Sequence, residues 1–152
     1  MKLPFSEEKS QTLGEKFAGL VAEKLAATPF VPGALEFIKK YHGTFTFFMA
    51  SGAPPWELKE QMEARGIQNY FMEVHGSGRS KTEIIQGILD RYGYAPEEVV
   101  FIGDAHTDMD ASRETGVHFI ARLKDQNFEP GECANSLNDL TQLEEILFHI
   151  RI

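Results

Sequence analysis

Three groups of polar residues could together bind an anion and a metal ion, and the first of them is Ser51-Gly52. The pair follows an apolar run and precedes two prolines, so a hydroxyl and a backbone N–H stand between a strand end and a helix start. Groups in that position can bind phosphate oxygens. A plain turn would give the same dipeptide, and taken alone Ser51-Gly52 favours the turn.

The second candidate is Lys81, in the first turn of a predicted helix. Ser80-Lys81-Thr82-Glu83 has the capping-box pattern that begins a helix. A cation at this end faces the positive pole of the helix dipole, which is unfavourable. The position is easier to accept where an anion is held nearby, and the alternative is a solvated surface lysine.

The third candidate is the acidic segment Gly103–Asp108, with Asp104 and Asp108 four residues apart after an apolar run. Two such carboxylates need a cation or hydrogen-bond donors to neutralise them. Mg²⁺ binds through one or two carboxylates together with phosphate and water. The spacing therefore predicts a metal site at Asp104 and Asp108, although Asp108 could instead be a helix N-cap. We expect Asp110 to be solvated, and His106 to be a solvated spacer rather than a ligand contact.

The elements that would position these residues alternate along the chain. Apolar runs predict strands at 44–50, 70–74, 99–102 and 117–121, and periodic segments predict helices at 32–43, 54–65, 80–92, 108–115 and 140–149, the last capped by Ser136. Such alternation predicts an α/β, three-layer Rossmann-like fold with a mostly parallel sheet. Ligands of these sheets bind beyond the carboxyl ends of the strands, where Ser51 and Asp104 would lie.

Composition excludes several classes of protein. The 152 residues suit one domain, and a formal charge of −8 disfavours nucleic acid and anionic membranes as partners. No apolar run is long enough to span a membrane, and the charged N-terminus does not resemble a signal peptide. The single cysteine, Cys133, cannot form an intramolecular disulfide, and we expect a small, partly buried residue. We expect a cytoplasmic protein.

Taken in order, these segments resemble three motifs of the haloacid dehalogenase-like (HAD-like) superfamily. Ser51 after an apolar strand resembles its second motif, Lys81 at a helix start its third, and Asp104-x-x-x-Asp108 its fourth. The helix and glycine that follow, 111–117, are similar to the phosphoglycolate-phosphatase-like branch. The likeness runs from about Pro29 to the C-terminus. An unrelated nucleotide-binding module is disfavoured because the chain has no glycine-rich loop of the common types.

The resemblance implies Mg²⁺-dependent hydrolysis of a phosphomonoester, in which an aspartate attacks phosphorus and water clears the aspartyl-phosphate. On this basis Ser51 and Gly52 would bind phosphate, and Lys81 would neutralise the phosphate and the nucleophile. Asp104 would hold Mg²⁺, with Asp108 supporting the metal or the lysine. The ligand would be a small phosphorylated metabolite.

One motif of the family is missing from the sequence. Its first motif is Asp-x-Asp at the end of a central first strand, yet no aspartate precedes Asp90. We therefore expect a helical cap remnant at 1–28 and a HAD-like core at 29–152 without its central first strand. Magnesium binding should be weak or absent, and the chain should be inactive alone. It would be a truncated or split hydrolase or, alternatively, a non-catalytic phosphate- and metal-binding module.

The missing strand should lie between the strands at 44–50 and 99–102. Each buried backbone group left unpaired there would cost about 1–3 kcal/mol. These backbone groups could be paired in three ways: the two strands pair directly, a second copy donates a segment, or another polypeptide supplies the strand. We therefore expect a homo-oligomer or a partner chain. The apolar face of a first helix, Ser6–Ala27, would pack against the core or form a dimer contact.

Overall fold

The computed structural model describes residues 27–152. Almost all of the helix predicted over Ser6–Ala27 lies outside these residues, as does most of the segment 1–28 interpreted as a cap remnant. Both stay predictions. Within residues 27–152, every helix is too short or too polar to cross a membrane.

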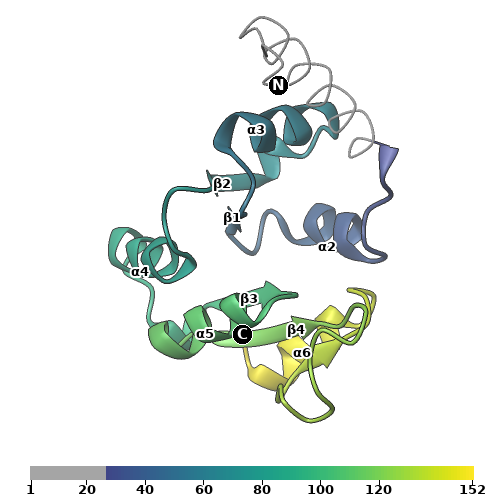
Figure 1. Cartoon of the computed structure of the whole chain (residues 1–152), viewed down its shortest axis with the longest axis vertical. Helices are drawn as coiled ribbons and strands as arrows, with labels where there is room; N and C mark the ends of the chain where they lie inside the picture. The colour runs from purple at the N-terminus through teal and green to yellow at the C-terminus, as the bar shows by residue number, and fades with distance from the viewer. Residues whose placement is uncertain (1–26) are drawn as a thin grey trace, which may run out of the picture.

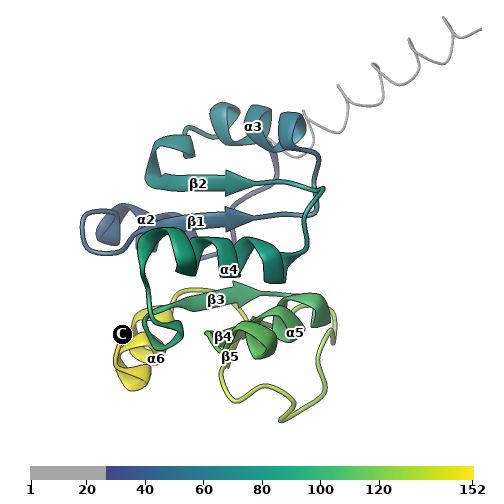
Figure 2. The same ribbon diagram turned by 90° about the vertical axis from the view of Figure 1, so that its left-hand side faces the viewer.

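Five parallel strands form two separate sheets (Figure 2). In one, β1 (Phe47–Ala50) pairs with β2 (Phe71–His75); in the other, β3 (Val100–Gly103) pairs with β4 (His118–Arg122), and β4 with the short β5 (Ser136–Leu137). The predicted parallel α/β architecture is confirmed. The direct pairing considered for β1 and β3 is wrong, because no strand within residues 27–152 pairs with either of their facing edges.

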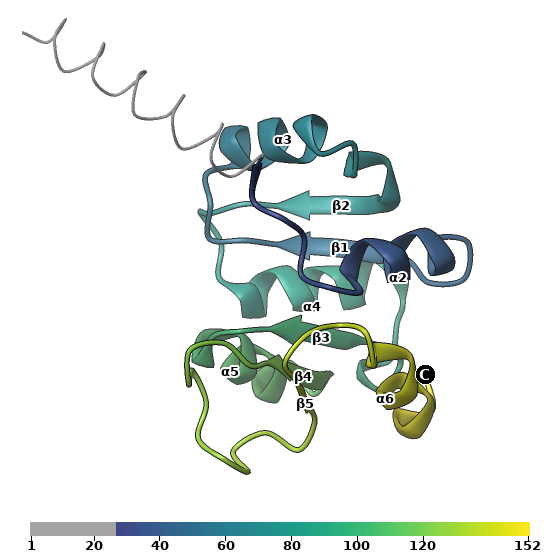
Figure 3. The ribbon, with the colours of Figure 1, turned by 90° about the vertical axis from the view of Figure 1, so that its right-hand side faces the viewer.

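Helices cover both faces of the strands (Figures 1 and 3). On one face lie α2 (Ala34–Tyr41) and α6 (Leu143–Ile150), and on the other lie α4 (Lys81–Tyr92) and α5 (His106–Thr115). Between β1 and β2 the chain passes through α3 (Pro55–Ala64), and short 3₁₀ turns at Gln68–Tyr70 and Pro96–Glu98 precede β2 and β3. The three-layer arrangement follows from the apolar strands, which need cover on both faces.

Some boundaries differ from those predicted. β1 begins at Phe47 because the amides of Thr44 and Phe45 bond the carbonyl of Tyr41 and prolong the turn after α2. β5 was not predicted, since two residues give no periodic pattern. Ser136 lies in β5 and so does not cap α6, which begins later than expected.

Each sheet has its own apolar core. Ile120 of β4 packs with Leu143 and Leu147 of α6, and a separate cluster around Leu58 and Met62 of α3 supports β1 and β2. Helix α4 connects the two sheets: its first residue bonds a carboxylate of α5 beside β3, and its last turn bonds a carboxylate of β2. Helices, rather than strand pairing, thus hold β1 and β3 in place.

The segment before α2 is fastened to the loop before α6. The Leu140 amide donates to the Pro32 carbonyl at 2.9 Å. Gly33 has φ +83°, and a Cβ there would lie 2.4 Å from the Leu140 carbonyl carbon, so only glycine permits this approach. This contact brings Val31 and Leu140 together beside the space between β1 and β3.

Candidate functional site

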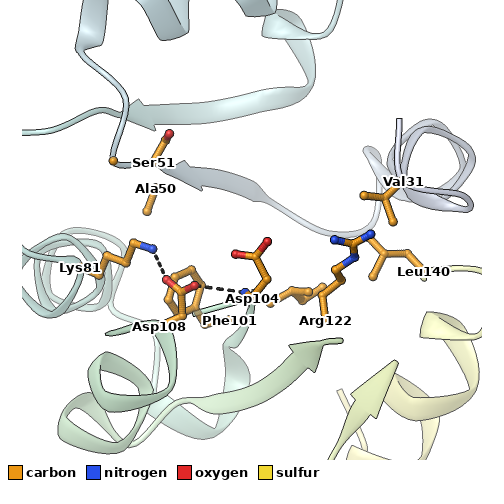
Figure 4. Close-up of a pocket in the computed structure, with 12 residues that line it drawn as sticks. Val31, Ala50, Ser51, Lys81, Phe101, Asp104, Asp108, Arg122 and Leu140 are labelled. Atoms are coloured by element: carbon orange, nitrogen blue, oxygen red, sulfur yellow. Dashed lines mark hydrogen bonds and ion pairs between the residues drawn. The ribbon is translucent and has the colours of Figure 1, made fainter. Parts of the chain in front are cut away.

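A pocket of about 380 Å³ lies between the carboxyl ends of β1 and β3 (Figure 4). It contains all five residues predicted to form the site, which come from both sheets and from α4 and α5. The residues that line it are Val31, Ala50, Ser51, Gly52, Lys81, Phe101, Ile102, Gly103, Asp104, Asp108, Arg122 and Leu140. The structure thus brings these groups together at the carboxyl ends of β1 and β3.

Ser51 and Gly52 form the corner of the pocket that follows β1. The Ser51 amide continues the pairing with β2 by donating to the His75 carbonyl at 2.9 Å, and the Ser51 hydroxyl accepts from the Ala53 amide at 3.1 Å. The hydroxyl proton therefore remains available to another acceptor. The Gly52 amide bonds no acceptor within residues 27–152. A hydroxyl and a free N–H side by side can bind one anionic oxygen each.

Lys81 begins α4, as the capping box predicted. Ser80 accepts from the Glu83 amide at 3.2 Å, and Glu83 accepts from the Ser80 amide at 2.7 Å. The ammonium of Lys81 donates to Oδ1 of Asp108 (Figure 4). Because that carboxylate is only 3% exposed, the ion pair fixes the lysine inside the pocket and not in solvent.

Asp108 uses both carboxylate oxygens within the protein. Oδ2 accepts from the amides of Asp104 and Ala105, at 3.2 and 3.0 Å. Asp108 is therefore not the N-cap residue; α5 begins at His106, and Asp108 lies at its third position. Gly103 makes room for it, because a Cβ there would stand 2.5 Å from the Asp108 side chain. This geometry positions Lys81 and the start of α5.

Asp104 is the acidic side chain left for a cation. Its carboxylate makes no hydrogen bond to any residue of the described range, and its backbone carbonyl accepts from Asn127 Nδ2 at 2.7 Å. No cluster of three His, Cys, Asp or Glu side chains suitable for a metal occurs within residues 27–152. The donors present fit Mg²⁺ only in part, with one free carboxylate to which phosphate, water or a further carboxylate must be added.

Arg122 is the charged residue of the pocket lining that we did not predict from the sequence. It ends β4, adjacent in the sheet to the end of β3. The sequence does contain one indication: a charged residue directly follows the apolar run 117–121, which was predicted to be a strand like the one that ends at Gly103-Asp104. Its Nε is buried and has no hydrogen-bond partner among the residues described.

The sequence matches the model of the family described as haloacid dehalogenase-like hydrolase over residues 2–122. This chain belongs to that family. It is similar to the phosphoglycolate phosphatase of Salmonella typhi, at 24% identity over 141 residues that cover 84% of this chain and 55% of the relative. The HAD-like chain thus spans about half the length of that curated relative.

Solved structures share the fold. A predicted phosphoglycolate phosphatase from Haemophilus somnus 129PT superposes with a TM-score of 0.74 at 15% identity, covering 93% of this HAD-like chain and 68% of that one. YfnB from Bacillus subtilis, described as a HAD-hydrolase bound to magnesium, gives a TM-score of 0.73 at 16% identity, with coverages of 97% and 66%. At these identities the likeness concerns the fold.

Three other side chains that could interact with a ligand lie outside this pocket. Trp56 is 55% exposed and does not line the pocket. His106 pairs with Glu132 at 2.9 Å instead of facing the site. Cys133 is partly buried, and burial raises the pKa of its thiol, which makes it a poor nucleophile.

Proposed function

We propose that this HAD-like chain provides the phosphate- and metal-binding half of a Mg²⁺-dependent phosphomonoesterase. The attacking carboxylate would come from an extended segment seated between β1 and β3. One observation carries the proposal: the five predicted residues line a single pocket at the point where two parallel strands face each other without pairing. Membership of the hydrolase family supports it.

The protein groups would bind and orient the phosphate. The Ser51 hydroxyl and the Gly52 amide would donate to its non-reacting oxygens, and Lys81, held by Asp108, would add a fixed positive charge. Asp104 would bind Mg²⁺, which when present screens the charge of the phosphate. The substrate would be a small phosphorylated metabolite, consistent with the volume of the pocket and with the name of the Salmonella relative.

The space between β1 and β3 supports the second part of the proposal. A parallel segment placed there could satisfy the facing edges of both strands, and its carboxyl end would arrive beside Ser51 and Asp104. We propose that a second copy of the chain or another polypeptide supplies that segment, in the cytoplasm. An open edge of this kind otherwise favours aggregation.

A fusion protein tests the proposal. It carries an apolar strand that ends in Asp-x-Asp, joined to Met1 through a flexible linker. The matched control carries Asn-x-Asn. We expect hydrolysis of p-nitrophenyl phosphate with Mg²⁺ only from the Asp-x-Asp fusion, and loss of that activity in Ser51→Ala and Lys81→Met versions. Equal hydrolysis by the unfused chain would refute the need for an added carboxylate. No hydrolysis by any version would refute the catalytic proposal.

One observation favours a non-catalytic module as the second candidate. Of the two carboxylates that line the pocket, Asp108 is fully engaged by Lys81 and two backbone amides. Only Asp104 is left, and no third carboxylate from residues 27–152 lines the pocket to act as a nucleophile. Phosphate binding by the unfused chain, with no turnover by either fusion, would support this alternative.

A further inference from the structure

The two cations of the pocket differ in how they are paired. The charge of Lys81 is met by Asp108, as described above. Arg122 forms no ion pair or hydrogen bond through its side chain with any residue from 27 to 152, and its Nε is shut off from water. Burying a guanidinium N–H without an acceptor is unfavourable, so an acceptor from outside the described residues is expected.

The strand geometry explains where Arg122 points. Side chains alternate along β4, so Arg122 shares a face with Ile120, which packs against α6. Figure 4 shows the guanidinium directed toward Val31 and Leu140, on the other side of Asp104 from Lys81. Apolar walls of this kind exclude water and strengthen the attraction for an anion.

Two carboxylates lie close enough to be considered as partners, and neither takes this role. Asp104 lines the same pocket, but no ion pair joins it to Arg122. Asp139 is directed to Thr141, whose hydroxyl and amide donate to it at 2.6 and 2.9 Å. Those hydrogen bonds lower the pKa of Asp139 most, and Arg122 adds only a weaker electrostatic contribution.

We propose that Arg122 binds a small oxyanion, phosphate or carboxylate, at a subsite separate from the Ser51–Lys81 corner. Arg122 lines the pocket, and its planar guanidinium offers several N–H donors at fixed angles, an arrangement that suits two oxygens of the same anion. Lysine offers a single point charge and cannot reproduce that pair of bonds. The protein as a whole repels anions at a net charge of −8, and an unpaired cation in the pocket counteracts that repulsion locally.

Titration of the full chain with inorganic phosphate, at constant ionic strength and without Mg²⁺, tests this subsite. We expect Arg122→Gln to weaken phosphate binding about tenfold or more, and Arg122→Lys to restore only part of the loss. The matched control is Arg113→Gln, which makes the same change at an exposed position on α5. It should bind phosphate as the native chain does, and a titration with malonate will show whether carboxylates share the subsite.

A second measurement is made on the native chain and uses a variant only to assign the resonance. In the native chain, the NMR resonance of the Arg122 Nε–H, assigned by its absence in Arg122→Lys, should move with phosphate and not with chloride. An unmoved resonance, or equal affinities for Arg122→Gln and Arg113→Gln, would overturn the proposal. Because neither experiment depends on turnover, a failure here is distinguishable from a failure of the fused-strand assay.

Discussion

Helix α4 is attached to the two sheets in different ways at its two ends. At its start, Lys81 bonds the buried Asp108, whose other oxygen is filled by two amides beside β3. In its last turn, Arg91 and Tyr92 bond Glu73 of β2, whose side chain is 22% exposed. If one partner of a buried ion pair is removed, the other is left as an unpaired charge away from water, which is costly. If one partner of a more exposed pair is removed, water solvates the other, so less stability is lost.

This difference bears on the site. Figure 2 shows β1 and β3 on either side of α4, with no strand between them in the described chain. Lys81 also lines the pocket. Its bond to Asp108 therefore both fixes a site residue and attaches α4 to the sheet that contains β3. The attachment at Glu73 involves no residue that lines the pocket. The two ends should therefore respond differently to substitution.

Removal of the buried carboxylate should have the largest effect. Asp108→Ala should lower the free energy of unfolding by about 3–5 kcal/mol, because Lys81 and two amides lose their acceptor. Chemical denaturation measures the change, and Asp108→Asn, which keeps an oxygen for the amides, should lose less. Asp110→Ala, at a position 61% exposed, is the matched control. Equal losses for Asp108→Ala and the control would show that the pair contributes nothing.

A steric clash with Asp108, at the same end of α4, should give the second-largest loss of stability. Gly103→Ala should cost about 1–3 kcal/mol, since its Cβ would stand 2.5 Å from Asp108 and push that side chain off its amides. The melting temperature of each variant reports the loss. Gly43→Ala, where a Cβ meets nothing within 4 Å, supplies the control. A Gly103→Ala protein as stable as native would mean that Asp108 can move without cost.

The half-exposed end should give a smaller, pH-dependent effect. Arg91 chiefly, with His75 and Tyr92, lowers the pKa of Glu73 to about 2 against the opposing effect of burial. Because the pKa of this carboxyl is lower in the folded than in the unfolded state, its ionised form stabilises the fold at any pH above the unfolded-state pKa. That stabilisation is lost as the pH falls toward 2. Glu73→Gln should cost about 1 kcal/mol at pH 7, a figure reduced for solvent screening.

Denaturation of native protein and Glu73→Gln should therefore converge as the pH is lowered from 5 to 2. Gln68→Glu, at an exposed position in the 3₁₀ turn before β2, changes the charge in the opposite sense and controls for net charge. A gap between native and Glu73→Gln that stays constant over this range would show that ionisation of Glu73 is not its source.

The smallest effect is expected where two exposed side chains meet. Lys40 and Glu144 join α2 to α6 at 2.8 Å, but their side chains are 60% and 57% exposed. Lys40→Met should leave the melting temperature unchanged within error, because such pairs contribute little in water. A clear drop would indicate that this contact helps to hold α2 against the second sheet.

Local sequence signals located much of the site. Ser51 and Asp104 were placed by the ends of apolar runs, and Lys81 by a capping box whose hydrogen bonds the structure contains. Each signal depends on a few neighbouring residues, so one sequence suffices to detect it. The same reasoning failed for β5 and for Ser136, where two residues of strand give no pattern that differs from a loop.

The sequence by itself therefore determined the parallel α/β class, the order of the motifs and the absence of an aspartate before Asp90. Only the tertiary structure decided that Asp108 holds Lys81, 27 residues away in the chain, that Arg122 enters the pocket, and that β1 and β3 stay apart. The physical reason is that strand and cap preferences arise between chain neighbours. The partner of a buried charge is set by which distant elements pack together.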